Sequence, residues 1–353
     1  MPRFNFTEFE AFAEAVQEAS ITMRIRSLEE PKWSLQYATV GSIRVQQGYE
    51  GGGSIAEGAT FSDGWEFYHQ LLPIHANGQV ATQDEVFACP PGGEFCLVCQ
   101  PCHKWLTVFV PTSLLFQSPQ ELEFASCARP QLLQPPPHVT RRFTSLVRRF
   151  LSSAESRSQL LDSPVALDCF QNELLTATKD LFTGCQHLPC RNFVRWYGQT
   201  KSTLELAMSH PDQSLSISDL ALQDGVPERT LRTAFQRCYG LSPVEYLRIL
   251  RLHQARRLLL GSCQDETTVT QIAFGLGFWD LGRFAGAYRQ LFGERPSETL
   301  RKPVRVSVGM GPNWPPRAKG AIAYGSRPAT GTVFACAVIA APPSRGVHAV
   351  PTR

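Results

Sequence analysis

The sequence lacks a long hydrophobic run, because its longest uninterrupted apolar stretch extends only from Val333 to Ala341. A helix that crosses a bilayer needs about 18–20 consecutive apolar residues, so no membrane-spanning segment and no membrane partner are expected. Residues 1–10 also lack a basic segment followed by an apolar one, which is the pattern of a secretion signal. These two absences predict a cytoplasmic protein.

Acidic residues are missing from the last part of the chain, although the 353 residues together carry a formal net charge of only +3. Residues 301–353 contain 8 basic residues, 8 prolines and 6 glycines, a composition that predicts a disordered basic tail. Residues 1–128, in contrast, carry 15 acidic and 6 basic residues. An acidic module joined to basic parts is typical of a protein that meets a polyanion.

Signatures of catalysis are also absent. The sequence contains no paired carboxylates, no nucleophile motif and no phosphate-binding glycine loop, so we expect neither an enzyme nor a cofactor. The 11 cysteines are odd in number and scattered, which favours reduced thiols over a disulfide framework. With 43% hydrophobic residues, the chain has enough apolar content for two cores and for two or three domains.

Residues 1–125 are predicted to be mostly β-structure. Apolar residues alternate with polar or small ones over residues 33–39, which is the pattern of a half-buried strand. Glycine-rich turn clusters at residues 51–53 and 77–78 separate such segments. Short strands with glycine-rich turns predict a sandwich or a small barrel, and the spacing of Phe9, Phe12 and Val16 predicts a helix before it.

Helical periodicity follows the proline run at residues 135–137. Apolar residues recur at helical spacing from Val139 to Phe150, with four arginines between them. Both a surface helix with solvated arginines and a basic helix for dimerisation or DNA contact fit this pattern. Ser163-Pro164 predicts the start of another helix that runs to about Phe182.

The last third of the chain contains an internal repeat. The segment from Leu231 to Pro243 aligns with the segment from Phe284 to Pro296 at an offset of 53 residues. Upstream, Leu220 aligns with Ile272 at an offset of 52 residues. Each copy predicts a short helix, a glycine-containing turn and a second helix with aromatic core residues, which is a helix-turn-helix arrangement.

A further helix is expected between the two copies. Ser242 and Pro243 supply its start, and Arg256 and Arg257 are expected in its last turn, where basic residues suit the helix dipole. A continuous helix here would hold the two copies at a fixed spacing.

These residues closely resemble the DNA-binding domain of the AraC/XylS family of bacterial transcription regulators. The match covers residues 203–300, and among its markers are Leu220-Ala221, Gly240-Leu-Ser-Pro243, Ile272-Ala273 and Gly277-Phe278. The resemblance implies two helix-turn-helix units joined by one long helix. It also implies a β-rich, cupin-like N-terminal domain that senses an effector or mediates dimerisation.

The predicted fold class is therefore a multidomain α+β protein. Its expected parts are a β-rich sensing domain at residues 1–125, a helical linker at 126–200, a DNA-binding domain with two helix-turn-helix units at 201–300, and the basic tail at 301–353.

The second helix of the first unit is predicted to bury Leu231, Phe235 and Cys238. The residues opposite them face the major groove if the helix docks as the resemblance implies, and a guanidinium there can donate two hydrogen bonds to guanine. In the second unit the outward positions have few hydrogen-bonding groups, so we expect the first unit to specify the sequence and the second to anchor the protein or sense DNA shape. The predicted DNA-contacting residues are Arg229, Arg232, Thr233, Gln236, Gly282, Arg283 and Arg289.

Two further clusters are considered as ligand sites. Trp65, Tyr68, His69 and Glu94 are candidates for an effector pocket, or else ordinary residues of a β-domain. No metal site is expected, although thiolates two residues apart can chelate zinc or an iron–sulfur cluster. The residues of that alternative are Cys96, Cys99, Cys102 and His103, which otherwise behave as small buried hydrophobes.

Together these patterns predict a sequence-specific DNA-binding transcription regulator, and the resemblance favours an effector-responsive activator. Double-stranded DNA, a small-molecule effector, RNA polymerase and a second copy of the chain are the expected partners. The alternatives are a thiol- or metal-sensing regulator and a metal-dependent cupin-type enzyme. The HxH spacing typical of metal-binding cupins is absent, which disfavours the enzyme.

Overall fold

The computed structural model of the chain describes residues 3–16, 19–118, 120–121, 128–155, 163–183, 185–190, 192–209, 216–262 and 267–302. Apart from its first two residues, the predicted basic tail at 301–353 lies outside the described residues. The strands are β1 (Phe4–Phe6), β2 (Ala19–Val40), β3 (Ile43–Thr60), β4 (Gly64–Gln70), β5 (Ile74–Ala76), β6 (Gln79–Ala81), β7 (Val86–Cys89), β8 (Glu94–Val98), β9 (His103–Pro111), β10 (Gln131–Gln134) and β11 (Gln186–Pro189). The helices are α1 (Phe9–Ala15), α2 (Thr112–Leu115), α4 (Pro137–Glu155), α5 (Pro164–Asp180), α6 (Phe193–Ser209), α7 (Ile217–Gln223), α8 (Glu228–Tyr239), α9 (Pro243–Gly261), α10 (Val269–Gly275), α11 (Leu281–Phe292) and α12 (Pro296–Leu300).

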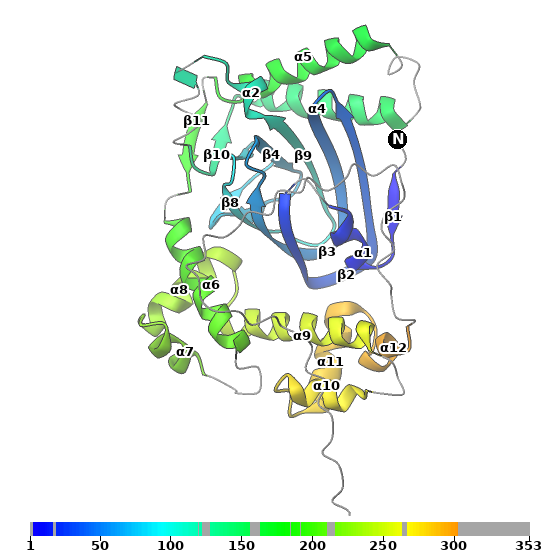
Figure 1. The fold of residues 1–353 in the computed structure, drawn as a ribbon, viewed down its shortest axis with the longest axis vertical. Coiled ribbons are helices and arrows are strands. Elements are labelled where there is room, and N and C mark those ends of the chain that lie inside the picture. The colour runs from blue at the N-terminus through cyan, green and yellow to red at the C-terminus, as the bar shows by residue number, and fades with distance from the viewer. Residues whose placement is uncertain are drawn as a thin grey trace, which may run out of the picture. The chain divides into compact units, whose positions relative to one another are not determined.

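The N-terminal part is a curled antiparallel sheet, which confirms the predicted β-structure (Figure 1). Its strand order is β11-β10-β7-β4-β9-β3-β8-β5-β6, and β2 pairs with β3 to form a long hairpin. Irregular pairing between Ile25 and Ser27, and again between Leu28 and Trp33, interrupts the hairpin. Such bulges bend and twist a strand, so the sheet curls into a half-barrel.

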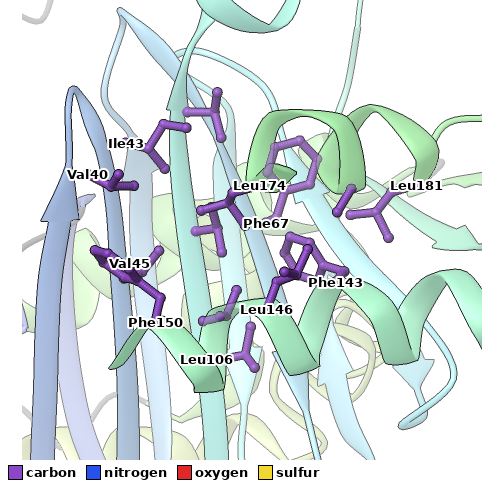
Figure 2. Packing of buried hydrophobic residues seen from close by; sticks show 14 of the residues in the cluster. Val40, Ile43, Val45, Phe67, Leu106, Phe143, Leu146, Phe150, Leu174 and Leu181 are labelled. Carbon is purple, nitrogen blue, oxygen red and sulfur yellow. The ribbon is translucent and has the colours of Figure 1, made fainter. Parts of the chain in front are cut away.

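Helices α4 and α5 cover one face of this sheet and complete its core (Figure 2). Phe143, Leu146 and Phe150 of α4 pack with strand residues such as Phe67 and Leu106. The four arginines of α4 are exposed, which fits both a solvated face and a basic contact surface. Helix α5 starts where its sequence predicts, because the Ser163 side chain caps it by accepting a hydrogen bond from the Ala166 amide.

The C-terminal part contains the two similar helix pairs, α7–α8 and α10–α11, joined by α9. Both α8 and α11 end at a glycine in the left-handed conformation, with φ of +63° at Gly240 and +77° at Gly293. A side chain strains this conformation and a glycine does not. Reciprocal capping boxes start α7 at Ser216, α9 at Ser242 and α10 at Thr268.

The prediction that Arg256 and Arg257 lie in the last turn of this helix is wrong, because α9 continues to Gly261 and its last turn contains no basic residue. Arg256 lies before that turn. It is buried, with ion pairs of 2.5 Å to Glu10 of α1 and 2.6 Å to Glu294. A sequence pattern could not show these partners, since one of them lies 246 residues away along the chain. Among the described residues no helix is long and apolar enough to cross a bilayer.

The core beneath α4 leads to a stability prediction. Phe143 is fully buried, so Phe143→Ala should lower the free energy of unfolding by about 3–5 kcal/mol through lost burial and a residual cavity. The matched control is Arg142→Ala on the same helix, whose 2.8 Å ion pair with Asp180 is exposed. An exposed pair contributes about 0–1 kcal/mol. Urea unfolding of the full chain measures both, and equal losses in the two variants would contradict this packing.

Candidate nucleic-acid interface and ligand cavity

Helix α8 has one buried and one exposed face. Leu231, Phe235 and Cys238 are fully buried, which confirms the prediction for this face. They pack in a core with residues of α6, α7 and α9 and with Ile55 of β3. The opposite face exposes four predicted DNA-contacting residues, namely Arg229, Arg232, Thr233 and Gln236. Their role in DNA binding stays a prediction.

On the exposed face of α8, an arginine and a glutamate form an ion pair. Arg232 forms an ion pair of 2.6 Å with Glu228 one turn earlier, and both side chains are largely exposed. Hydrogen bonds from Ser218 and Arg232 lower the pKa of Glu228, which keeps this carboxylate charged. Because an exposed pair of this kind is weak, the Arg232 guanidinium can exchange this partner for another acceptor.

Helix α11 presents a different surface. Asp280 caps the helix by accepting a 2.9 Å hydrogen bond from the Arg283 amide, and its carboxylate also pairs with the Arg283 side chain. Gly282, Arg283 and Arg289 are exposed, as is Gly286. The exposed face of α11 therefore offers cations and bare backbone but few neutral hydrogen-bonding groups.

A groove of about 1150 Å³ runs along the exposed face of α8. Its walls include Arg229, Arg232 and Arg237 on one side and His75 and Gln79 of the β5–β6 hairpin on the other. Gly78 in the turn of that hairpin has φ of +79°, and a Cβ there would lie 3.2 Å from the carbonyl oxygen of Arg237. The three arginines make the groove suitable for an anion.

A second hollow lies inside the half-barrel, on the sheet face opposite α4 and α5. Its free volume is about 50 Å³, and its walls combine apolar and aromatic side chains with polar ones. The polar and aromatic members of this cavity are Gln46, Glu50, Glu66, Tyr68, Phe87, Phe95, Trp105 and Thr107. A concave apolar site with a few converging polar groups is the usual form of a small-molecule site.

Glu50 is a buried acid of this cavity. Its Oε1 accepts a 2.8 Å hydrogen bond from the Trp105 indole, while no hydrogen bond of ordinary geometry reaches Oε2 from the part of the chain that the structure describes. Burial raises the pKa of Glu50 to about 7, and Ser54 and Trp105 offset this effect only in part. The Glu50 carboxyl therefore titrates near neutral pH in a site where a ligand could pair with it.

Strand β3 connects this cavity to the helical part of the chain. Ala56 faces the cavity, whereas the next residue, Glu57, points to the opposite side. There Glu57 pairs with Arg24 at 2.5 Å and accepts hydrogen bonds from the hydroxyls of Tyr239 at 2.9 Å and Tyr246 at 2.7 Å. Burial raises the pKa of both tyrosines well above the usual range, so both hydroxyls remain protonated donors.

The four predicted effector residues do not gather at one site. Tyr68 lines the cavity, and its hydroxyl forms a 2.8 Å hydrogen bond with Nε2 of His103. Trp65 lies on the helix-facing side of β4, in the core with α4 and α5. His69 is buried with its ring 2.9 Å from the Gln83 carbonyl, and Glu94 pairs with Lys201 of α6 at 2.6 Å.

The cysteine cluster is also divided. The Cys96 thiol points to the α8 carbonyl of Cys238 at 3.4 Å, whereas the Cys99 thiol faces Tyr68 at 3.6 Å in the cavity. Burial raises the pKa of both thiols, so neither is a ready thiolate ligand. Within the described ranges, no group of three or more His, Cys, Asp or Glu side chains could hold a metal ion.

Comparison with known proteins identifies a matching domain family and similar regulators. The profile of the "Helix-turn-helix domain" family matches residues 220–302. The "Probable thc operon regulatory protein" of Rhodococcus erythropolis is 34% identical over 169 residues, which is 45% of this chain and 50% of that protein. The chain thus spans about half the length of this relative.

Two further similarities are to a curated relative and to a solved structure. The "XylDLEGF operon transcriptional activator 2" of Pseudomonas putida is 32% identical over 126 residues, which is 36% of this chain and 80% of that protein. A solved structure of a transcriptional regulator with an AraC-type DNA-binding domain, from Chromobacterium violaceum, is 28% identical. The similarity covers 30% of this chain and 93% of that one, with a TM-score of 0.28.

The raised pKa of Glu50 predicts a pH-dependent stability. The unfolded carboxyl ionises near its ordinary value of 4.5, and the folded one ionises only near 7. The unfolded state therefore loses its proton first, so the contribution of Glu50 to stability is highest below pH 4.5 and falls as the pH rises to 7, by about 3 kcal/mol. Glu50→Gln keeps the shape and the acceptor for Trp105, and it should remove this fall.

Urea unfolding of the wild-type and Glu50→Gln chains at pH 5 and pH 8 tests the prediction. The free energy of unfolding of Glu50→Gln, relative to that of wild type, should be higher at pH 8 than at pH 5. The exposed carboxylate of Glu173 on α5 provides the control, and Glu173→Gln should lack this gain. A constant difference between Glu50→Gln and wild type at both pH values would show that Glu50 is not buried in this way.

Proposed function

Since the chain belongs to the AraC/XylS family of transcription regulators, we propose that it is a sequence-specific DNA-binding transcription activator that responds to a small-molecule effector. One observation carries this proposal. Within the domain that matches the family, α8 buries its apolar face and exposes Arg229, Arg232, Thr233 and Gln236 together on the other. These side chains can donate to or contact base edges in a major groove.

The proposal assigns separate tasks to the two helix pairs. Both α7–α8 and α10–α11 act as helix-turn-helix units, with α9 as the helix between them, in a DNA-binding domain at residues 201–300. Arg229 and Arg232 of α8 specify bases through bidentate hydrogen bonds. Arg283 and Arg289 of α11 neutralise phosphates, which fixes position without sequence information.

The effector is proposed to bind in the cavity of the cupin-like half-barrel. Glu50, Tyr68 and Trp105 line it, and the buried carboxyl of Glu50 lacks a partner of ordinary geometry for Oε2 in the described chain. Because the free volume is only about 50 Å³, a ligand larger than a few atoms must widen the cavity. Strand β3 would transmit that change from Ala56 to Glu57 and so to α8 and α9.

The remaining assignments follow from this proposal. Residues 1–125 sense the effector or mediate dimerisation, residues 126–200 connect them to the DNA-binding domain, and RNA polymerase is the partner at the promoter. The protein acts in the cytoplasm, where its DNA is, and as a regulator it needs no catalytic site.

Genome-wide chromatin binding of the tagged chain tests the proposal, with Arg232→Ala as the variant. Wild type should give discrete promoter peaks, and Arg232→Ala should lose them because base contacts disappear. Arg149→Ala, an exposed arginine of α4, controls for loss of charge and should keep the peaks. Binding that is diffuse or absent in all three chains, with and without candidate effectors, would overturn the proposed function.

The division between α8 and α11 is tested with purified protein and the DNA of one peak. Arg283→Ala should weaken binding about equally for all sequences and reduce the slope of log affinity against log salt by about 0.9, since one phosphate contact is lost. Arg232→Ala should instead relax the preference at one base pair by about 5- to 150-fold. A base-specific loss in Arg283→Ala would contradict the assignment.

A further inference from the structure

The turn before α11 is one residue longer than its counterpart before α8. Gly225-Val226 and Gly277-Phe278 align at an offset of 52 residues, but the helices that follow start at Glu228 and Leu281, an offset of 53. The second copy therefore has Trp279 and Asp280 where the first has only Pro227. Asp280 serves as the helix cap, so Trp279 is the additional residue.

Trp279 is exposed and held in place. Its relative exposure is 69%, and its ring stacks on Phe274 of α10 with centroids 5.7 Å apart. Phe274 and Leu281 are also exposed, at 40% and 36%. On either side, the Phe278 amide donates a 2.9 Å hydrogen bond to the Ala273 carbonyl and Asp280 caps α11. A contiguous exposed apolar patch marks an interaction site.

The chemistry of α11 defines what this patch can contact. Helix-turn-helix proteins place the first residues of their second helix against base edges in the major groove. Around Trp279 those positions are Leu281 and Gly282, which have no side-chain donor or acceptor. The one apolar group on a base edge in that groove is the thymine methyl.

Charge favours DNA as the occupant of the patch. Arg283 and Arg289 on the same helix are exposed cations that can meet phosphates. The nearby Asp280 carboxylate is engaged by the Arg283 amide and side chain. A Cβ at Gly286 would meet nothing within 4 Å, so nothing in the described chain fills the space beside the α11 backbone there.

We propose that Trp279, supported by Phe274 and Leu281, contacts thymine methyl groups and so makes the second helix pair selective for thymine as well as an anchor. This inference rests on the proposed function, because it requires that α10–α11 docks on duplex DNA.

The experiment starts from a duplex that the wild-type full chain selects from a random-sequence pool. Each thymine of that duplex is replaced in turn by deoxyuridine, which removes only the 5-methyl group. At one or two positions wild type should bind about three- to fivefold more weakly, because each methyl loses its apolar contact. Trp279→Ala should bind the thymine duplex at least about fivefold more weakly and should be insensitive to deoxyuridine at those positions.

Val165→Ala is the matched control, because Val165 on α5 is an equally exposed apolar residue at 71%. It should retain both the affinity and the sensitivity of wild type. Circular dichroism and thermal unfolding should match wild type for Trp279→Ala, since an exposed side chain is removed.

Three results overturn the inference. The first is that Trp279→Ala binds the thymine duplex as tightly as wild type does. The second is that Trp279→Ala binds the thymine and deoxyuridine duplexes more weakly than wild type by the same factor. The third is a change in sedimentation of Trp279→Ala without a change in DNA affinity, which would assign the patch to a contact between copies. Failure of wild type to select any duplex would instead refute the proposed function itself.

Discussion

The ion pair between Glu57 and Arg24, completed by the hydroxyls of Tyr239 and Tyr246, is the contact on which the relation between sheet and helices depends. One carboxylate on β3 accepts from residues of β2, α8 and α9. Removal of one partner of a buried pair leaves an uncompensated charge, at a typical cost of about 3–5 kcal/mol. The end of helix α8 is therefore held by an acid that belongs to the half-barrel, and the surrounding apolar core with Ile55 and Cys96 strengthens the same contact.

Because side chains alternate along a strand, β3 can serve two sites at once. Glu50 and Ala56 face the cavity, while Ile55 and Glu57 face the helices. A ligand that moves the backbone at Ala56 must also move its neighbours on both sides. The backbone of β3 therefore connects the cavity directly to the residues that contact α8 and α9, without an additional hinge.

The two helix pairs have a similar backbone but different exposed side chains. Helix α8 exposes arginine, threonine and glutamine, whereas α11 exposes glycine, arginine and the apolar patch that begins at Trp279. The capping boxes that start α7 and α10 and the left-handed glycines that end α8 and α11 are common to the two pairs. The exposed residues are free to differ, because a solvent-facing position contributes little to folding.

The sequence by itself determined the local structure and the family. Helix starts at Ser163 and Ser242, the terminal glycines of α8 and α11, the buried residues of α8 and the β-rich N-terminal part could all be predicted, since each depends on neighbours within a few residues. Only the tertiary structure decided which face of β4 lines the cavity, and it placed Tyr68 there and Trp65 beneath α4 and α5. Glu50 and Gln46 are polar residues of β3 that line the cavity only because the sheet curls. Arg256 and Glu57 likewise find their partners 246 and 182 residues away. Alternation of apolar and polar residues along a strand shows that its two faces differ. The elements that cover those faces, however, come from distant parts of the chain.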